Sequence, residues 1–421
     1  MSFNTISVIG LGYIGLPTAA MFASRKKKVI GVDVNQHAVD TINRGEIHIV
    51  EPDLDIIVHA AVTEGYLKAT ISPEPADAFL IAVPTPFKNN DSEIPEPDLS
   101  YIKKASEAIA PVLKKGDLVI LESTSPVGAT EQMAEWLAIA RPDLSFPQNA
   151  KESADINVAH CPERVLPGHV VRELVENDRV IGGMTEKCSA KAVELYKTFV
   201  QGECVITNAR TAEMAKLTEN SCRDVQIAFA NELSIICDKL DIDVWELISL
   251  ANRHPRINIL QPGPGVGGHC IAVDPWFIVS KTPEQAQIIH TARKVNDAKP
   301  QWVVNKVKLA ISDFLQANPT KTAKDVTVAC YGLAFKPDID DLRESPALNI
   351  TKQINEMHSG VVIAVEPNID EMPSSLAALK LLSFDNAVSE ADIHLLLVDH
   401  KEFKTSLVKT DYLIDTKGIW K

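Results

Sequence analysis

The sequence is short of the features that mark membrane proteins and nucleic-acid-binding proteins. No apolar run reaches the roughly 20 residues that a membrane-spanning helix needs, and no signal-like segment precedes the first apolar stretch. The net charge is −14, so the chain has no basic excess with which to bind a nucleic acid. We therefore expect a cytoplasmic protein with neither a membrane nor a nucleic-acid partner.

Paired cysteines are missing as well. The seven cysteines are an odd number, and none of them belongs to a CxxC pair, which argues against a disulfide framework and against a metal site. They are expected to be free thiols that pack mostly as small apolar groups. Neither a metal nor a disulfide is therefore expected to define the fold.

The chain has enough apolar material for several cores. Its 421 residues are 45% apolar, which is too much for one core and predicts two or three domains. The N-terminal stretch follows a strand, turn, helix, strand pattern, and further apolar runs end near loop signals. This alternation predicts a doubly wound parallel sheet. The expected strands are 5–9, 29–33, 78–83, 118–121, 156–159 and 179–181, with a first helix at 17–24.

A long helix is expected in the middle of the chain. Neither glycine nor proline occurs between Gly202 and Pro255, and residues 209–240 are rich in strong helix formers. A helix of about 30 residues measures about 45 Å, which is longer than one compact domain usually needs. Apolar residues lie on both of its faces, so we expect a homodimer that buries part of it: Leu217, Val225, Ile227, Phe229, Leu233 and Ile236.

A second βαβ pattern follows the polar stretch 318–324. Its expected strands are 326–331, 361–365, 393–398 and 412–415, with a helix at 346–357. The predicted fold class is therefore α/β, with two Rossmann-like doubly wound parallel-sheet domains joined by a long central helix. Domain boundaries are expected near residues 205 and 318.

The segment Gly10-Leu-Gly-Tyr-Ile-Gly15 matches a dinucleotide-binding fingerprint in its required context, after a strand and before a helix. In this motif the first glycine makes the turn, the second admits the pyrophosphate and the third allows close helix packing. Asp33 ends the next strand, where a carboxylate accepts hydrogen bonds from a ribose and repels a 2′-phosphate. NAD is therefore favoured over NADP, although the motif alone also admits FAD. The expected cofactor residues are Gly10, Gly12, Tyr13, Ile14, Gly15 and Asp33.

Two later loops follow expected strands and are predicted to close over the cofactor. The first contains Thr85, and the second, residues 122–130, contains Thr124 and Thr130. Their hydroxyl groups suit ribose, nicotinamide or water, although each threonine is also an ordinary turn or cap residue.

The stretch from Gln261 to Asp274 sets Cys270 at the end of a glycine-rich loop, with a carboxylate four residues on. Glycines let the backbone approach a ligand closely, and a reactive thiol needs access and an electropositive setting. The stretch thus has two interpretations. It presents a thiol nucleophile, or it is a proline-glycine connector beside a buried free cysteine.

Lys216, Asn220 and Arg223 share one face of the expected long helix, at spacings i, i+4 and i+7. A solvated charged stripe is the ordinary interpretation of such a pattern. However, asparagine is a poor choice for a plain exposed face, and all three groups orient or neutralise oxygen anions. A lysine beside a thiol and a nicotinamide cofactor indicates alkoxide stabilisation or proton abstraction.

Several long motifs, in order along the whole chain, resemble the UDP-glucose/UDP-mannose dehydrogenase family. They are GLGYIGLP, ESTSPVG, CPERVLPG, the stretches 213–220 and 229–232, GPGVGGHCIAVD, and the stretch 335–345. More narrowly, Arg164-Val165 and the stretch 252–256 look like the branch that oxidises UDP-N-acetyl-D-mannosamine for surface polysaccharide, including enterobacterial common antigen. Arg164 stands where the family's usual motif has an aromatic residue, which fits a different sugar substituent.

The resemblance implies a four-electron oxidation of a sugar C6 alcohol to a carboxylate by two NAD. Cys270 is implied as the nucleophile that forms a thiohemiacetal and then a thioester. Lys216 and Asn220 are implied to handle protons and oxyanions. Asp274, Glu163 and Thr124 are implied to orient the lysine and water. The same chemistry on UDP-N-acetylglucosamine or UDP-glucose is the alternative.

The resemblance also assigns the three parts of the chain. Residues 1–205 bind NAD, residues 206–318 form a dimerisation region that carries catalytic groups, and residues 319–421 bind the UDP-sugar. An arginine near position 256 can cross to the neighbouring subunit, and Arg343 is implied to reach NAD. The implied substrate residues are Arg164, Val165, Lys216, Asn220, Arg223, His254, Arg256, Gly267 and Lys336.

Two other interpretations are weighed against this one. A two-electron β-hydroxyacid or 6-phosphogluconate type dehydrogenase shares a Rossmann domain, long helices and a lysine-asparagine pair. It needs neither Cys270 nor the region after Val326. A non-catalytic NAD sensor would not require Lys216, Asn220 and Cys270 together.

Overall fold

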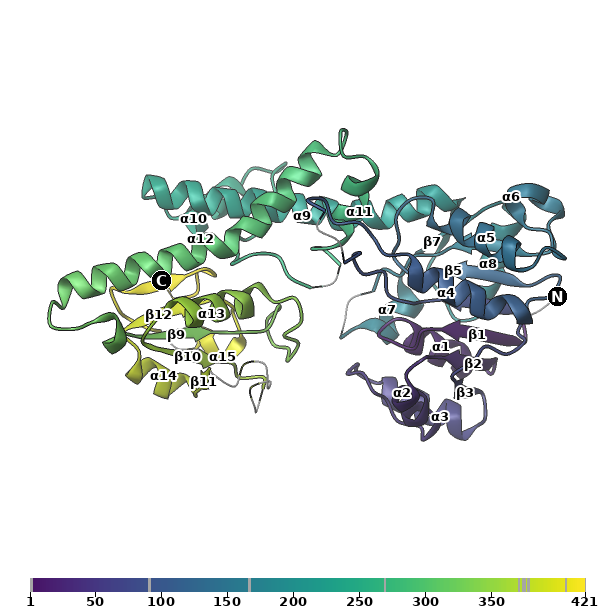
Figure 1. Ribbon diagram of the computed structural model, residues 1–421, viewed down its shortest axis with the longest axis horizontal. Coiled ribbons are helices and arrows are strands. Elements are labelled where there is room, and N and C mark those ends of the chain that lie inside the picture. The colour runs from purple at the N-terminus through teal and green to yellow at the C-terminus, as the bar shows by residue number, and fades with distance from the viewer. Residues whose placement is uncertain are drawn as a thin grey trace. The chain divides into compact units, whose positions relative to one another are not determined.

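The computed structural model describes residues 3–89, 92–165, 168–268, 270–369, 372, 376, 379–405 and 407–420. The chain forms two compact units, Met1–Glu219 and Asn220–Lys421 (Figure 1). The boundary between them falls inside the long helix α9, Ala209–Leu240, whose ends are the ones that the sequence predicts.

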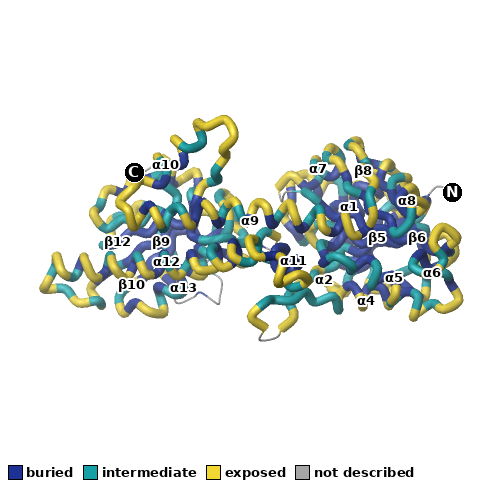
Figure 2. Tube along the Cα trace, turned by 90° about the horizontal axis from the view of Figure 1, so that it is seen from above, coloured by how far each residue is buried: buried dark blue, intermediate teal, exposed yellow. Residues whose placement is uncertain are grey.

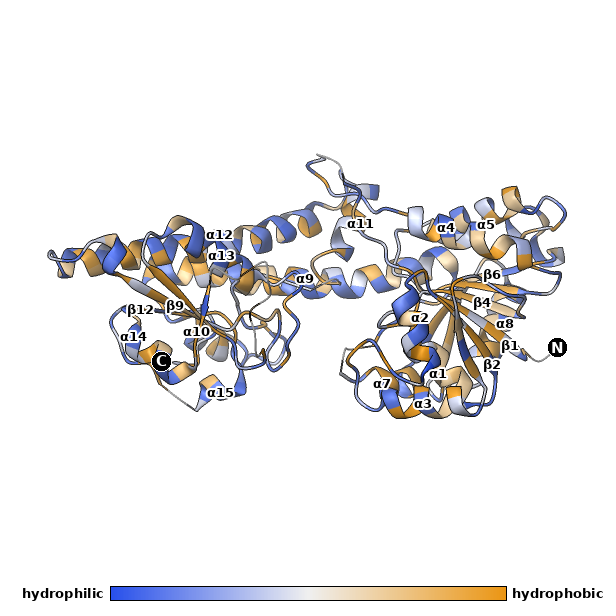
Figure 3. Ribbon diagram, turned by 60° about the horizontal axis from the view of Figure 1, so that its bottom comes forward, coloured by the Kyte–Doolittle hydropathy of each residue, from blue (hydrophilic) through white to orange (hydrophobic). Residues whose placement is uncertain are grey.

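The first unit is built on an eight-stranded sheet in the order β3-β2-β1-β4-β5-β6-β7-β8. Strands β3 to β6 of this order run parallel to one another. The central strands β1, β4, β5 and β6 are buried and mostly apolar, as Figures 2 and 3 show by their colours, whereas the edge strand β8 is largely exposed. This confirms the doubly wound α/β class. The strands are β1 Thr5–Ile9, β2 Lys28–Val32, β3 Leu67–Thr70, β4 Ala78–Ile81, β5 Leu118–Leu121, β6 Asn157–His160, β7 Arg179–Gly183 and β8 Cys204–Asn208.

One strand pair departs from the expected parallel arrangement. β7 runs antiparallel to β6, with Ala159 opposite Gly183 and His160 opposite Gly182. β8 then pairs parallel with β7. An antiparallel neighbour can start at the edge where the previous strand ended, so the chain needs no crossover between β6 and β7. The reversal brings Arg179, the first residue of β7, to the carboxyl edge of β6.

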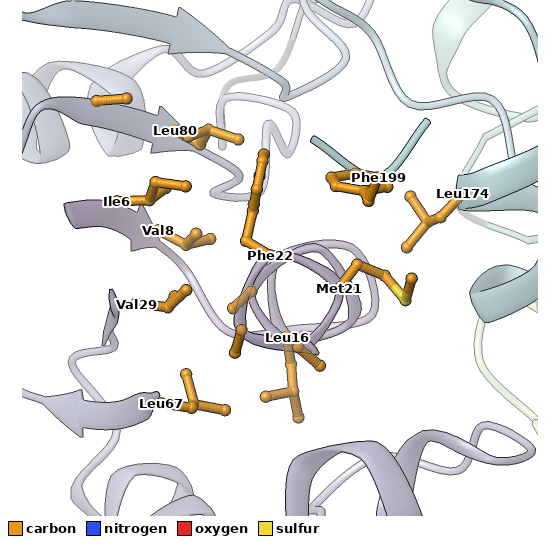
Figure 4. Packing of buried hydrophobic residues seen from close by; sticks show 14 of the residues in the cluster. Ile6, Val8, Leu16, Met21, Phe22, Val29, Leu67, Leu80, Leu174 and Phe199 are labelled. Carbon is orange, nitrogen blue, oxygen red and sulfur yellow. The ribbon is translucent and has the colours of Figure 1, made fainter. Parts of the chain in front are cut away.

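Helix α1 contributes many buried residues to the first core. Its residues Met21 and Phe22 are buried, and Phe22 lies against Phe199 with ring centroids 4.7 Å apart at 83° (Figure 4). The helices of this unit pack around the sheet. They are α1 Gly15–Ser24, α2 Gln36–Asn43, α3 Leu54–Thr63, α4 Ser100–Ile109, α5 Ala129–Ala140, α6 Pro147–Ala150, α7 Val170–Glu176 and α8 Glu186–Tyr196, with 3₁₀ turns at Ala110–Val112 and Lys151–Ser153.

The second unit contains a long helix that sequence patterns did not reveal. α12, Gln287–Ala317, has 31 residues and contains Pro300 in its interior. A proline normally ends a helix pattern, so this segment does not look like one continuous helix in the sequence. α12 packs beside α9 and α13. The remaining helices here are α10 Val244–Ala251, α11 Asp274–Lys281, α13 Pro346–Met357, α14 Phe384–Glu390 and α15 Lys401–Lys404, with a 3₁₀ turn at Ala323–Asp325.

A five-stranded parallel sheet forms the other part of the second unit, in the order β11-β10-β9-β12-β13. The predicted strands match to within two residues. The strands of this sheet are β9 Thr327–Tyr331, β10 Val361–Val365, β11 Lys380–Leu381, β12 Ile393–Leu396 and β13 Leu413–Asp415, of which the short β11 was not predicted. Within the described part of the chain, no helix has the length and apolar character needed to cross a bilayer.

Candidate functional site

The glycine turn after β1 has the geometry of a dinucleotide cradle. Gly10 has φ +90°, and a Cβ there would lie 2.6 Å from the carbonyl oxygen of Ala82. A Cβ on Gly15 would lie 1.7 Å from the carbonyl oxygen of Gly10. Gly12, by contrast, is exposed, with nothing within 4 Å of its ideal Cβ position. Two glycines therefore serve packing, while Gly12 keeps the outer side of the turn open for a ligand at the N-terminus of α1.

Asp33 is held at the end of β2 by backbone N–H groups. Its Oδ2 accepts from the N–H of Leu11 at 2.8 Å, and its Oδ1 accepts from the N–H of Asn35 at 2.9 Å. The residue is only partly buried. The carboxylate is thus fixed beside the turn with lone pairs left for a ribose, and Tyr13 and Ile14 lie at the opening of α1. These residues fit NAD.

The three threonines have different surroundings. The Thr85 hydroxyl donates to the carbonyl oxygen of Thr124, which ties the loop after β4 to the loop after β5. Thr130 is fully buried, and its hydroxyl donates to Oε1 of Glu213 at 2.6 Å. The N–H groups of Gly128 and Thr130 donate to the same carboxylate. Gly128 and Thr130 thus tie the start of α5 to Glu213 on α9, and the expected cofactor contact of Thr130 stays a prediction.

Glu213 is a residue that the sequence did not single out for this role. It lies on α9 and is 1% exposed. Burial raises the pKa of its carboxyl group, although the bonds from Thr130 and Gly128 oppose that shift. Arg210 and Lys216 each lie one helical turn from Glu213, a pattern typical of surface ion pairs, so the sequence contained no signal for this role.

Glu163 lies just beyond β6 and is nearly sealed from solvent. Its Oε1 accepts from the N–H of Arg164 at 2.7 Å, and its Oε2 is 2.7 Å from Nη1 of Arg179. The Arg164 side chain instead pairs with Glu219 on α9, with Nη2 and Oε1 2.6 Å apart. Val165 packs against the first core. Arg164 and Glu163 thus have separate partners, and the carboxylate of Glu163 is paired with a buried arginine.

Cys270, Asn220 and Asp274 come together in the second unit. The amide Nδ2 of Asn220, on α9, donates to Oδ2 of Asp274 at 2.5 Å. Asp274 begins α11 and is 3% exposed, and its N–H donates to the carbonyl oxygen of Cys270 at 2.9 Å. Cys270 itself is exposed. The structure therefore rejects the buried-connector interpretation, because the thiol is accessible at the turn that opens α11.

Lys216 and Arg223 flank Asn220 on the same helix. Lys216 precedes Asn220 by one turn and is partly buried, whereas Arg223 is exposed. The i, i+4 spacing predicted for the lysine and the asparagine holds because α9 is continuous through both residues.

The glycines before Cys270 pack against the chain itself. A Cβ on Gly267 would lie 2.5 Å from the carbonyl oxygen of Glu344, and Gly268, at φ +82°, would meet the ring of Phe335 at 3.4 Å. The close approach that we expected toward a ligand is therefore made, at Gly267, toward the segment that precedes α13. That segment also carries the exposed Lys336.

Arg343 and the loop with His254 and Arg256 lie on the surface of the second unit. The guanidinium of Arg343 pairs with Asp341, with Nη2 and Oδ2 2.6 Å apart. The loop is closed by Asn252, which donates to the carbonyl oxygen of Ile259 at 2.9 Å and accepts its N–H at 2.7 Å. Sequence reasoning missed this clamp, which holds His254 and Arg256 in an exposed loop.

A buried polar network between α9 and α12 was also missed. Nη1 of Arg293 donates to Oδ1 of Asp224 at 2.6 Å, and Nδ2 of Asn296 donates to the same oxygen at 2.8 Å. Asn231 bonds to Asn296 at 2.9 Å and accepts from the N–H of Gly263 at 2.9 Å. The network therefore fixes the start of the glycine loop to both long helices of this unit.

Comparisons with known proteins agree with this arrangement. Three models of the UDP-glucose/GDP-mannose dehydrogenase family match in order: the NAD binding domain at 4–200, the central domain at 210–298 and the UDP binding domain at 329–421. Their description names GDP-mannose where we expected UDP-mannose.

Full-length relatives are similar to the chain as well. A UDP-N-acetyl-D-mannosamine dehydrogenase of Yersinia pestis is 68% identical over 100% of both chains. An NDP-N-acetyl-D-galactosaminuronic acid dehydrogenase of Ralstonia nicotianae is 63% identical over 100% of this chain and 97% of its own. The solved UDP-D-ManNAc dehydrogenase of Pyrococcus horikoshii has a TM-score of 0.85 and 38% identity, over 99% of this chain and 96% of its own. Because the family models cover most of the sequence in one order, the chain belongs to the UDP-glucose/GDP-mannose dehydrogenase family and is an NAD-dependent nucleotide-sugar dehydrogenase.

Proposed function

We propose that the protein oxidises the C6 alcohol of UDP-N-acetyl-D-mannosamine to the carboxylate. For a substrate R–CH₂OH, the balanced reaction consumes two NAD⁺ and one water and yields R–COO⁻, two NADH and three H⁺. The observation that carries the proposal is the exposed Cys270 at the start of α11, beside the hydrogen-bonded pair Asn220 and Asp274. A two-electron alcohol dehydrogenase has no use for such a thiol.

The site residues have separate roles in the two oxidations. NAD, when bound, accepts a hydride from the substrate carbon in each oxidation. Lys216 accepts or stabilises the negative charge that develops on the C6 oxygen, and Asn220 holds that oxygen. The sulfur of Cys270 adds to the aldehyde carbon, and the thiol proton passes to the carbonyl oxygen. The resulting thiohemiacetal is oxidised to a thioester, which keeps the reactive aldehyde bound.

The last step is hydrolysis. Water adds to the thioester carbonyl, the carbon–sulfur bond breaks, and the thiolate of Cys270 leaves. We assign Glu163 and Thr124 to this water and Asp274 to the orientation of Asn220 and the lysine, consistent with the 2.5 Å bond between Asn220 and Asp274. Thr85, through its bond to Thr124, positions the same loop.

The sugar nucleotide is assigned to a set of mostly basic residues at exposed or half-exposed positions. Lys336 supplies an ammonium group for the phosphates, and Arg343 is assigned to NAD. Three segments give the division of roles that we propose: 1–205 for NAD, 206–318 for catalysis and dimerisation, and 319–421 for the UDP-sugar. The other substrate residues are Arg164, Val165, Arg223, His254, Arg256 and Gly267.

A second candidate substrate has support from one specific observation. The 63% identity to an NDP-N-acetyl-D-galactosaminuronic acid dehydrogenase is only slightly below the 68% identity to a UDP-N-acetyl-D-mannosamine dehydrogenase. The purified protein should therefore be assayed with UDP-N-acetylmannosamine, UDP-N-acetylgalactosamine, UDP-N-acetylglucosamine and UDP-glucose. We expect two NADH per UDP-N-acetylmannosamine and the highest kcat/KM for it. One NADH per sugar would contradict the four-electron reaction, and preference for another sugar would replace the substrate.

Replacement of the nucleophile gives the sharpest test of the chemistry. Cys270→Ser should lower the rate of complete turnover by about 10³-fold or more, because a hydroxyl is a much weaker nucleophile than a thiolate. Binding of UDP-sugar should persist. Cys222→Ser is the matched control, since Cys222 is also an exposed thiol. A near-normal rate for Cys270→Ser removes this residue from the mechanism.

We also propose that the protein is a homodimer through α9 and α12. Phe229 is 54% exposed and Ile288 is 72% exposed, and both line a groove of about 370 Å³ with Val225, Ala228 and Val295. A second copy of the chain covers such a groove with the same apolar residues. Light scattering should give a dimer at micromolar concentration, and Phe229→Glu should give a monomer. Ile139→Glu, at a 78% exposed position on α5, is the control and should stay dimeric.

The dimer would also complete the substrate site through Arg256 of the neighbouring subunit. A mixture of Cys270→Ser and Arg256→Ala subunits, allowed to exchange, should then regain activity that neither variant has alone. No gain on mixing would place Arg256 in its own subunit's site. We further propose a cytoplasmic location, supported by an odd number of cysteines with no CxxC pair, and a role in supplying surface polysaccharide, including enterobacterial common antigen.

A further inference from the structure

A buried charge cluster lies at the carboxyl edge of the first sheet. It contains Glu163 after β6, Arg179 at the start of β7, and Glu122 after β5, with Tyr196 of α8. The Arg179 side chain is 4% exposed and that of Glu163 is 7% exposed. Groups this deep in a protein need a charge partner, because a buried unpaired charge is costly.

Arg179 is held on three sides. Its Nη1 lies 2.7 Å from Oε2 of Glu163. Its guanidinium carbon lies 4.9 Å from the ring centroid of Tyr196 and 5.9 Å from that of Phe199. A planar guanidinium that lies over two aromatic rings and within ion-pair distance of a carboxylate has little rotational freedom. Glu163 therefore faces a fixed cation.

The reversed strand explains why this pair exists. Ala159 lies opposite Gly183 and His160 opposite Gly182, and continuation of this antiparallel register sets Glu163 opposite Arg179. A parallel β7 would begin at the other edge of the sheet, with Arg179 far from Glu163. Because β7 runs antiparallel to β6, Arg179 lies at the edge of the sheet where the loops after β1, β4, β5 and β6 begin.

The neighbouring carboxylate shows what happens without a paired cation. Burial raises the pKa of Glu122 to about 7, with the charge of Glu163 adding to the rise and Arg179 opposing it. The Tyr196 hydroxyl donates to Oε1 of Glu122 at 2.5 Å. One arginine therefore serves two carboxylates, and it is in direct contact with Glu163.

We infer that Arg179 is the positioning residue of Glu163: it pins the carboxylate at the carboxyl edge and supplies its counter-charge, so that Glu163 acts as a pure acceptor toward water. This inference rests on the proposed function, in which that water hydrolyses the Cys270 thioester. In that step the water oxygen bonds to the acyl carbon, the carbon–sulfur bond breaks, and one water proton goes to Glu163 and then to solvent. No oxidant is consumed, and we assign Arg179 no contact with substrate or cofactor.

The test compares Arg179→Gln, Arg179→Lys, Glu163→Gln and the double variant Arg179→Gln/Glu163→Gln. Arg172→Gln is the matched control, because Arg172 and Glu176 are also 2.7 Å apart but Arg172 is 76% exposed. We expect Arg179→Gln to lower kcat by about 10²-fold, as a slightly misplaced catalytic group does, with little change in KM. Mass spectrometry of the intact protein should detect an acyl adduct on Cys270 that accumulates during turnover.

Two further readouts separate positioning from simple support of the fold. The double variant should be no slower than Glu163→Gln alone, since Arg179 acts only through Glu163. Arg179→Lys should restore part of the rate, because it keeps the charge.

The outcomes that overturn the inference are distinct from failure of the proposed function. Additive losses in the double variant, or slow release of the first NADH without an adduct, would show that Arg179 does not act through Glu163. If Arg179→Gln fails to bind NAD, Arg179→Lys is tested in its place. A wild-type rate of Arg179→Lys without an acyl adduct on Cys270 would overturn the inference. If the wild-type protein makes no NADH from any nucleotide sugar, it is the proposed function that fails.

Discussion

The turns after β1 and β9 have the same backbone geometry, but their acidic residues have different surroundings. In each, a glycine with φ near +90° follows the strand: Gly10 donates its N–H to the carbonyl oxygen of Val32, and Gly332 donates to that of Val365, both at 2.8 Å. In each, an acid after the next strand accepts from the N–H group that follows the glycine. Asp33 accepts from Leu11, and Glu366 accepts from Leu333 at 2.7 Å.

The difference is what surrounds the acid. Asp33 is partly exposed. Glu366 is 3% exposed and accepts further bonds from Ala334, Asn368 and Nε2 of His400. Nδ1 of His400 accepts from the N–H of Asp338, so Nε2 carries the proton. The first turn keeps its acid for a ligand, and the second uses its acid to hold its own loop. Nucleotide recognition in the second unit is therefore expected from residues such as Lys336.

The largest effect should follow from removal of the sealed acid. Glu366→Ala leaves His400 and two backbone N–H groups buried without their acceptor, so the free energy of unfolding of the second unit should fall by about 3–5 kcal/mol. The NAD dissociation constant should not change. Thermal unfolding and hydrogen exchange of β9 and β10 measure the change in stability, and NAD titration measures the dissociation constant. Glu390→Ala is the control, since its partner pair with Lys380 is exposed.

If Glu366→Ala were as stable as the control, the acid would not hold its loop and the comparison would fail. A change in NAD affinity with normal stability would mean that the second turn resembles the first in function as well as in backbone.

Stability should depend on pH in opposite ways around the two buried glutamates Glu122 and Glu366. The pKa of Glu122 is raised to about 7 by burial, so its contribution is present at pH 4 and is lost as pH rises to about 7. This amounts to about 3 kcal/mol at most for the first unit. Burial alone would raise the pKa of Glu366, but bonds from His400 and Leu333 outweigh it and lower the pKa. Its contribution is therefore lost as pH falls below the usual glutamate range.

Hydrogen exchange at pH 5 and pH 8 resolves the two units. We expect Glu122→Gln to remove part of the pH dependence in β5 to β7 and to leave β9 to β12 unchanged. If the wild-type protein and Glu122→Gln lost protection against exchange equally at both pH values, Glu122 would be charged in the folded protein.

The parts of this comparison that sequence patterns could predict are the local ones. β1, β5, α9, β10 and α13 have the predicted ends, because uninterrupted apolar runs, or a run without glycine and proline, define them. The glycine turn and Asp33 were also predictable, since their spacing is short. The site trio of Cys270, Asn220 and Asp274 combines two segments that motifs marked, although no motif gives the bond between them.

The features that sequence patterns could not predict depend on residues far apart in the chain. Pro300 hides the continuity of α12, which packs against α13 and is hydrogen-bonded to α9 through Arg293 and Asn296. The sealing of Glu366 by His400 links positions 34 residues apart, and the Glu163–Arg179 pair depends on the direction of β7. Period and propensity contain no information on strand direction, so the reversed strand could not be inferred from them.

The smallest predicted effect concerns the open turn itself. Asp33→Asn keeps an oxygen for the N–H of Leu11 but removes the charge that strengthens a hydrogen bond to ribose, so NAD should bind about 10- to 100-fold more weakly. Its preference for NAD over NADP should narrow, because a neutral amide no longer repels a 2′-phosphate. Calorimetric titration with both nucleotides measures this, with Asp40→Asn, an exposed acid on α2, as the control. An unchanged NAD dissociation constant would mean that Asp33, like Glu366, serves only its own turn.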